Sequence, residues 1–344
     1  MPLCGKRGLT TVYGYTSRKN TVNFHSWPSH LRRPHSSPEW VSLITCTATC
    51  LILGSIRDAA GLSSQPITMK KLESGISGLE NVDLNVHEEY AARFLVVATG
   101  ENSRGFIPEV SGLDSFGGEF IHSSKYEKGQ KYRGKDVVVV GCGNSGMEIA
   151  YDLSNWGART SIVARSPVHV LSTNIVYIGM RLLGFGVPCK IVDFIVVLLS
   201  KLKHGDISKY GLPRPSEGPF YIKQRVGRTP TIDVGTVEKI RRKEVQVFPS
   251  IRGIQGSRIE FASGEIKRFD AIIFATGYKS TVRHWLKGGQ DLFDESGMPK
   301  LCFPNIWKGK NGLYCSGFAR RGLFGISVDS QNIAKDIDLA LKSQ

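Results

Sequence analysis

The fold can be predicted from one part of the sequence, DVVVVGCGNSGMEIAYDLSNWGARTSIVA, residues 136–164. Its opening run, 136–140, is nearly all apolar, as in a strand of a parallel sheet that is covered on both faces. Residues 147–156 then have the spacing of a helix with one apolar face, which ends at Gly157, and residues 160–164 form the next apolar strand. Strand, glycine turn, helix and strand together have the length of one βαβ unit.

The turn of this unit reads GCGNSG, a G-x-G-x-x-G motif. In this place Gly141 permits the tight turn, Gly143 lets the backbone approach a pyrophosphate, and Gly146 lets helix and strand pack closely. We expect the phosphates at the free N–H groups of the helix start, at Asn144 and Ser145. A glycine turn without a ligand is the alternative, but a preceding strand and a following helix favour a dinucleotide site.

The end of the second strand selects the dinucleotide. A cofactor with a free ribose 2′-OH is recognised there by Asp or Glu, whereas this chain has Arg165 and Ser166. An arginine pairs with a 2′-phosphate through two hydrogen bonds, and a serine hydroxyl donates a further one. We therefore predict NADPH, and not NADH or FAD, at this site. A solvated surface charge is the alternative interpretation of Arg165.

Two further apolar runs end in Ala-Thr-Gly, at 98–100 and at 275–277. Because they bracket the βαβ unit, they indicate two chain crossings between two nucleotide-binding domains, where glycines let the backbone turn beside a cofactor. The residues that we assign to flavin or NADPH contacts here are Thr99, Gly100, Asn102, Thr276, Gly277 and Tyr278.

Other elements surround this unit. Residues 258–261 and 265–269 flank an Ala-Ser-Gly turn and predict a hairpin. Residues 271–275 predict another buried strand. Apolar residues four apart within 329–341 predict an amphipathic closing helix.

A longer pattern, F-x-G-x-x-x-H-x-x-x-Y at residues 116–126, precedes the glycine-motif strand. With this pattern the chain resembles the class B flavin-dependent monooxygenases, and most of all their plant YUCCA-type branch. The resemblance covers about residues 91–344. The other strings that carry it are FLVVATGEN (94–102), GCGNSGMEIAYDLSNWGA (141–158), VARSPVHVL (163–171), GRTPTIDVG (227–235), FATGYKS (274–280) and GLYCSGFARRGLFGIS (312–327).

The resemblance implies an α/β fold in which a Rossmann-like NADPH domain, residues 113–270, is inserted in an incomplete Rossmann-like FAD domain, residues 76–112 and 271–344. It implies an enzyme that uses NADPH, FAD and O2 on a small 2-oxo acid, converting indole-3-pyruvate to the auxin indole-3-acetate with loss of CO2. The flavin carries this chemistry, so no side chain is assigned as catalytic and no metal site is expected.

Residues 1–75 depart from the family pattern. Family members hold the FAD pyrophosphate on an earlier G-x-G-x-x-G, and none precedes residue 91 here. We therefore expect weak FAD binding and low turnover, with a catalytically impaired NADPH-binding remnant as the alternative function. Residues 1–38 are basic and rich in Ser and Pro, which resembles a transit-type leader or a translated stretch without a selected fold.

The charge and the cysteines bear on partners and location. The net charge is +15, from 45 Lys and Arg against 30 Asp and Glu, and suits an anionic partner. Because the charge is dispersed and no RNA-binding or zinc motif is present, nucleic acid ranks last. Seven cysteines without a C-x-x-C pair favour a reducing compartment, so we expect the cytoplasm or the surface of the endoplasmic reticulum.

Two apolar stretches raise the question of a membrane. Residues 40–56 are too short and too polar for a span. Residues 191–200 are shorter still and contain Asp193, but basic residues flank them and a place on a membrane surface is open. A buried helix is the favoured interpretation of 191–200, with peripheral membrane association as the alternative.

Overall fold

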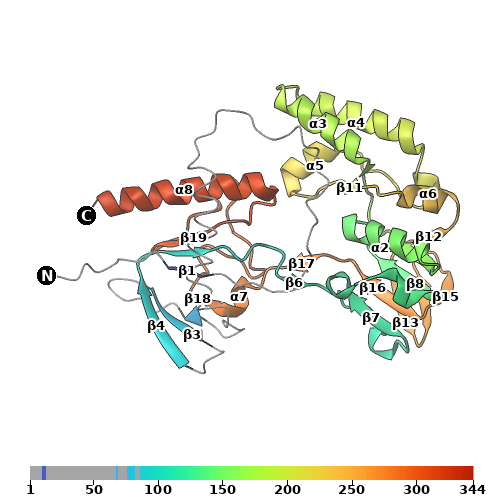
Figure 1. Cartoon of the computed structure of the whole chain (residues 1–344), viewed down its shortest axis with the longest axis horizontal. Helices are drawn as coiled ribbons and strands as arrows, with labels where there is room; N and C mark the ends of the chain where they lie inside the picture. Colours follow the sequence, from blue (N-terminus) through green and yellow to red (C-terminus); the bar gives the residue numbers. More distant parts are fainter. Residues whose placement is uncertain (1–9, 13–66, 69–75, 82–85, 344) are drawn as a thin grey trace. The chain divides into compact units, whose positions relative to one another are not determined.

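The computed structural model describes residues 10–12, 67–68, 76–81 and 86–343. They divide into two compact units, one of Gly105–Tyr278 and one of Met1–Arg104 with Lys279–Gln344 (Figure 1). The apolar stretch at 40–56 lies outside the described residues, as does all of 1–38 except β1 (Thr10–Val12).

The unit Gly105–Tyr278 is built on a five-stranded sheet in the order β12-β9-β8-β16-β7. Every neighbouring pair of these strands is parallel, which confirms the α/β class and the parallel sheet that residues 136–164 predict. The strands are β7 (Glu119–His122), β8 (Asp136–Val140), β9 (Arg159–Val163), β12 (Val245–Phe248) and β16 (Ala271–Phe274).

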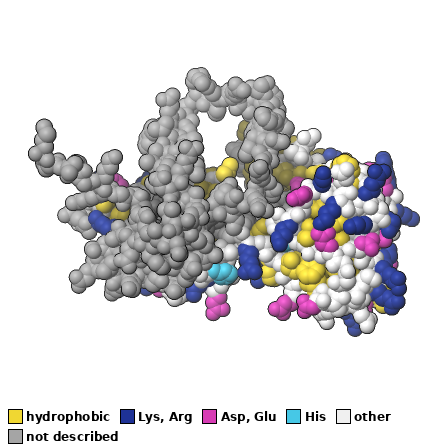
Figure 2. Space-filling model, turned by 60° about the horizontal axis from the view of Figure 1, so that its bottom comes forward, with side chains coloured by type: hydrophobic (Ala, Val, Ile, Leu, Met, Phe, Trp, Pro, Cys, Tyr) yellow, Lys and Arg dark blue, Asp and Glu magenta, His cyan; other side chains and the backbone are white. Residues whose placement is uncertain are grey.

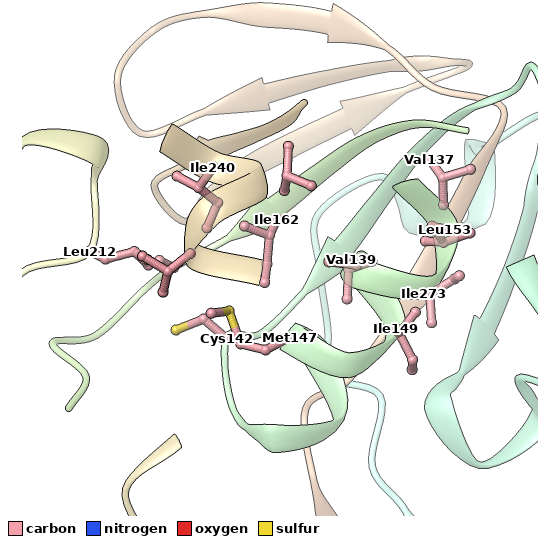
Figure 3. Close-up of a cluster of buried hydrophobic side chains, with 14 of the residues drawn as sticks. Val137, Val139, Cys142, Met147, Ile149, Leu153, Ile162, Leu212, Ile240 and Ile273 are labelled. Atoms are coloured by element: carbon pink, nitrogen blue, oxygen red, sulfur yellow. The ribbon is translucent and has the colours of Figure 1, made fainter. Parts of the chain in front are cut away.

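Both faces of this sheet are covered. On one face α2 (Asn144–Asn155) and α6 (Thr236–Arg241) pack on β8 through Val137 and Val139 (Figure 3). On the other face Val138 packs with the antiparallel sheet of β13 (Ile251–Gln255), β14 (Arg258–Phe261) and β15 (Ile266–Arg268). The hairpin at 258–269 is confirmed, and this double cover is the reason that β8 is apolar on both sides.

The unit is wider than the predicted NADPH domain. β16 lies between β8 and β7 in the sheet, although residues 271–344 are assigned from the sequence to the FAD remnant. At the other end the unit begins at Gly105 and not at 113, because Ile107 and Val110 pack in the core beneath the antiparallel sheet. Which cofactor each unit binds stays a prediction.

Three helices project from this unit between β10 (Val170–Leu171) and β11 (Thr231–Ile232). α3 (Thr173–Gly184), α4 (Cys189–His204) and α5 (Pro219–Val226) share a small apolar core of their own. The prediction of a buried helix over 191–200 is therefore half wrong. α4 buries Val192 and Val196 completely, but Phe194 is 69% and Leu202 75% exposed.

In the other unit, β5 (Leu95–Val97) lies between β1 and β19 (Leu313–Cys315) in a parallel sheet. α8 (Gly322–Lys342) follows β19 and begins before residue 329, where the sequence predicts its start. The prediction missed the first turns because they expose Leu323 and Phe324 and lack the apolar pattern of a helix face that packs on a core. The remaining elements are β2 (Ile67–Thr68), β3 (Ile76–Asn81), β4 (Val86–Ala92), β6 (Arg104–Gly105), β17 (Tyr278–Lys279), α7 (Val282–Trp285) and β18 (Leu286–Lys287).

Candidate functional site

The carboxyl ends of three neighbouring strands meet at one edge of the five-stranded sheet. Val140, the last residue of β8, is in register with Val163 of β9 and with Phe274 of β16. The glycine motif, the Arg165-Ser166 pair and the turn 276–278 follow these three strands directly. The sheet thus brings the residues that are predicted to bind NADPH close to Thr276, Gly277 and Tyr278, which are predicted to contact flavin or NADPH. Ligands of open α/β sheets bind in such a crevice at the strand ends.

Two glycines of the motif are required by the protein's own packing. Gly141 has a φ of +114°, and a Cβ there would lie 2.5 Å from the carbonyl oxygen of Ala275. A Cβ on Gly146 would lie 1.9 Å from the carbonyl oxygen of Gly141. The turn and the helix–strand contact predicted for these positions are both present.

Gly143 is different, because nothing in the protein requires a glycine there. Its φ of −75° suits any residue, and a Cβ would meet no atom within 4 Å. Gly143 is the N-cap of α2, whose first-turn N–H groups have no acceptor within the helix and lie at its positive end. Open space beside unpaired N–H groups is what a pyrophosphate needs, so the loop fits the dinucleotide that its motif predicts.

The loop is held in place by residues far along the chain. The side-chain oxygen of Asn144 accepts the N–H of Ile232 at 2.7 Å, and the Thr231 hydroxyl donates to the carbonyl of Cys142 at 3.1 Å. The side chain of Asn144, predicted to contact NADPH, therefore braces the loop, while Ser145 stays exposed. The role of Thr231 is not apparent from sequence, although it lies in the GRTPTIDVG string.

A second arginine lies beside the end of β9. Arg165 is exposed and Ser166 half-buried, as a contact with a cofactor in solution requires. Arg228 donates a hydrogen bond to the carbonyl of Pro167 at 2.8 Å, which brings its guanidinium to the same strand end. A small pocket there is lined by Pro167, Val168, His169 and Arg228, among others. Sequence reasoning missed Arg228, which also belongs to the GRTPTIDVG string.

The F-x-G-x-x-x-H-x-x-x-Y pattern fastens this edge of the sheet. A Cβ on Gly118 would lie 2.3 Å from the carbonyl oxygen of Asp270, so only glycine fits. The Tyr126 hydroxyl donates to Asp152 of α2 at 2.7 Å, and the same carboxylate oxygen accepts the N–H of Gly129. The pattern therefore fixes β7 against β16 and α2.

The histidine of the pattern, His122, contacts the second Ala-Thr-Gly stretch, residues 275–277, which is the second predicted chain crossing. His122 Nδ1 accepts the N–H of Ser124 at 3.1 Å, so Nε2 carries the proton and donates to the carbonyl of Gly277 at 3.0 Å. Burial lowers the pKa of His122, which keeps the ring neutral at pH 7. The Thr276 hydroxyl donates to the carbonyl of Phe106, and Tyr278 packs edge-on against His122. The side chains of Thr276 and Tyr278 thus hold the crossing together.

The predicted flavin residues of the other unit lie at a separate strand edge. Gly100 follows β5 and Gly317 follows the parallel strand β19, and a Cβ on Gly317 would lie 3.9 Å from the Cα of Gly100. The buried hydroxyl of Thr99 has no hydrogen-bond partner among the described residues, whereas Asn102 is exposed. Two glycine turns and an unpaired hydroxyl fit contact with part of a flavin.

Asp329 of α8 lies beneath this edge. It is fully buried, and its Oδ2 accepts the N–H of Gly317 at 3.3 Å, while Oδ1 has no partner in the described part of the chain. Burial raises the pKa of Asp329 to about 6. No sequence signal had marked this residue. Among the described side chains no group of three His, Cys, Asp or Glu is placed to hold a metal ion.

Comparison with known proteins shows to which family the chain belongs. Residues 78–177 match the family described as pyridine nucleotide-disulphide oxidoreductase. The probable indole-3-pyruvate monooxygenase YUCCA10 of Arabidopsis thaliana is 49% identical over 259 residues, which are 75% of this chain and 67% of the relative. The indole-3-pyruvate monooxygenase YUCCA4 of Oryza sativa subsp. japonica is 47% identical over 254 residues, 72% of this chain and 57% of the relative.

Solved structures share the fold. A flavin-containing monooxygenase from Stenotrophomonas maltophilia superposes with a TM-score of 0.56 at 18% identity, over 80% of this chain and 70% of that one. OTEMO in complex with FAD and NADP gives a TM-score of 0.57 at 15% identity, over 80% and 66%.

These matches define the class as flavin monooxygenases, which are oxidoreductases. The chain belongs to the YUCCA-type family of indole-3-pyruvate monooxygenases. It spans 67%, 60% and 57% of the lengths of the first three relatives that it matches.

Proposed function

We propose that this chain is an NADPH- and flavin-dependent monooxygenase that converts indole-3-pyruvate to indole-3-acetate, with O2 as co-substrate and loss of CO2. The observation that carries the proposal is Gly143, which leaves open space at the α2 N-terminus although the protein itself does not require glycine there. The names of the relatives supply the substrate.

The residues of the chain bind and orient. In the proposal the loop N–H groups at 143–146 hold the NADPH pyrophosphate, and Arg165, Ser166 and Arg228 hold the 2′-phosphate. The edge formed by Thr99 and Gly100 contacts the flavin, which when bound accepts the hydride and activates O2. Because the cofactor supplies the chemistry, we assign no side chain as catalytic.

Replacing Arg165 by Ala is expected to weaken NADPH binding by about 1.5–3 kcal/mol, the contribution of a charge-assisted hydrogen bond. NADH binding should be nearly unchanged, because NADH lacks the 2′-phosphate that the guanidinium recognises. Titration calorimetry with both dinucleotides measures the two effects.

Arg258→Ala serves as the matched control, since Arg258 is an exposed arginine on the antiparallel sheet. It should change neither affinity. Equal losses of NADPH and NADH in Arg165→Ala would reject the assignment of Arg165 to the 2′-phosphate.

A catalytically impaired NADPH-binding remnant is the second candidate function. The sequence favours it, because this sequence contains one G-x-G-x-x-G motif, whereas family members use a second such motif to bind FAD. The absorption spectrum of the purified chain separates the two functions, because bound oxidised flavin absorbs visible light. Flavin at stoichiometric level, with NADPH oxidation and CO2 release in equal amounts upon adding indole-3-pyruvate, supports the monooxygenase. NADPH binding without flavin or turnover supports the remnant.

A further inference from the structure

The α3–α4 hairpin exposes an unusual number of large apolar side chains. Monomeric proteins expose single apolar residues routinely, but a contiguous group marks an interaction surface. Phe185, at the tip between the two helices, is 74% exposed. The residues of this surface, called the hairpin face below, are Tyr177, Ile178, Met180, Phe185, Ile191, Phe194, Leu198 and Leu202.

The helical spacing makes the α4 part of the hairpin face continuous. Ile191, Phe194, Leu198 and Leu202 are three or four residues apart, so they form one stripe along α4. The stripe lies opposite the buried residues of α4 described above. α3 runs beside α4 (Figure 1), and Gly179 allows the close approach, because a Cβ there would lie 2.9 Å from a methyl group of Val196.

The exposed charges within the hairpin, residues 173–204, all have one sign. Arg181, Lys190, Lys201 and Lys203 are all exposed. The only acidic residue within 173–204 is Asp193, which is buried and accepts the N–H groups of Phe220 and Tyr221 at 2.8 and 3.0 Å. In the coloured part of Figure 2, Lys and Arg are scattered among Asp and Glu.

We propose that the hairpin face docks this chain on an anionic membrane surface. Apolar side chains of such a face enter the headgroup region by roughly 5–10 Å, while lysines contact the lipid phosphates. A protein partner is disfavoured, because lysines are depleted in protein interfaces and here Lys190 and Lys201 flank the apolar stripe of α4. Among the helices that the structure describes, none has the length and apolar character of a membrane span.

Flotation of the full chain with lipid vesicles tests this proposal. The protein should float with vesicles of phosphatidylcholine and phosphatidylserine, much less with phosphatidylcholine alone, and less at high salt. Lys190→Ala with Lys201→Ala should weaken binding about thirtyfold, which is about 2 kcal/mol at about 1 kcal/mol per basic residue. Phe194→Ser with Leu202→Ser should weaken it at least about tenfold.

Matched controls distinguish a specific face from general charge or stickiness. Arg258→Ala with Arg268→Ala removes two exposed arginines elsewhere, and Leu339→Ser removes an apolar residue that is 65% exposed on α8. Both should float like the unaltered chain. Circular dichroism and thermal unfolding of every variant report whether it is folded.

Three results would overturn the proposal. The first is equal flotation of the lysine variant and the unaltered chain. The second is an equal loss in the arginine control, which would show an effect of net charge alone. The third is absence of vesicle binding together with self-association that the Phe194→Ser, Leu202→Ser variant abolishes, which would make a second copy the occupant.

Discussion

Gly143→Val is expected to abolish dinucleotide binding while the protein stays folded. A Cβ at position 143 meets no protein atom within 4 Å and the backbone φ of −75° suits valine, so the unit should stay folded, with a loss of about 1 kcal/mol because valine is a weaker N-cap than glycine. The same side chain fills the space that the pyrophosphate needs beside the α2 N-terminus. Loss of only two charge-assisted hydrogen bonds of about 1.5 kcal/mol each weakens NADPH binding by a factor of more than about one hundred.

Gly146→Val is the informative comparison for this variant. A Cβ there would lie 1.9 Å from the carbonyl oxygen of Gly141, so this substitution should unfold or strongly destabilise the unit. Thermal unfolding and NADPH titration of both variants separate the two roles of glycine. An unaltered NADPH affinity in Gly143→Val would show that the phosphates lie elsewhere.

Asp329→Asn is expected to stabilise the chain at neutral pH by up to about 3 kcal/mol. The pKa of Asp329 is raised to about 6 by burial, from an ordinary value of 3.8. Between these pH values the folded state holds a proton that the unfolded state has lost, so stability falls as pH rises through this window. Above about pH 6 the whole cost is present, since each pH unit between the two pKa values contributes about 1.4 kcal/mol. Asparagine carries no charge and removes this cost.

Asp336 of the same helix provides a control of opposite sign. Its hydrogen bond with Lys308 lowers the pKa of Asp336, so it stabilises the fold above its ordinary pKa and loses that effect as pH falls. Asp336→Asn should therefore destabilise at neutral pH. Urea unfolding of both variants between pH 4 and 8 measures these slopes. A stability of Asp329→Asn that depends on pH between 4 and 6 like that of the unaltered chain would contradict the role of Asp329.

Elements with local sequence signals are predictable from the amino-acid sequence. An apolar run, a glycine turn and a helical repeat are contiguous at 136–164, and each of them specifies its own conformation without distant partners. The hairpin at 258–269 was predictable for the same reason, since its turn residues lie between its strands. Arg165 and Ser166 were placed at the site because parallel strands of one βαβ unit end at the same edge.

Features that depend on contacts between residues far apart in the sequence become visible only in the folded structure. Thr231 donates to Cys142, 89 residues earlier, and β16 joins the sheet of β8 from the far end of the unit. No local pattern reports such pairing, because its free energy comes from burial and hydrogen bonds made after the chain has folded back. The exposure of Phe194 and Leu202 was hidden for the same reason. An apolar run predicts a helix whose burial is favourable. Which faces of that helix are buried depends on the neighbouring elements that pack against it.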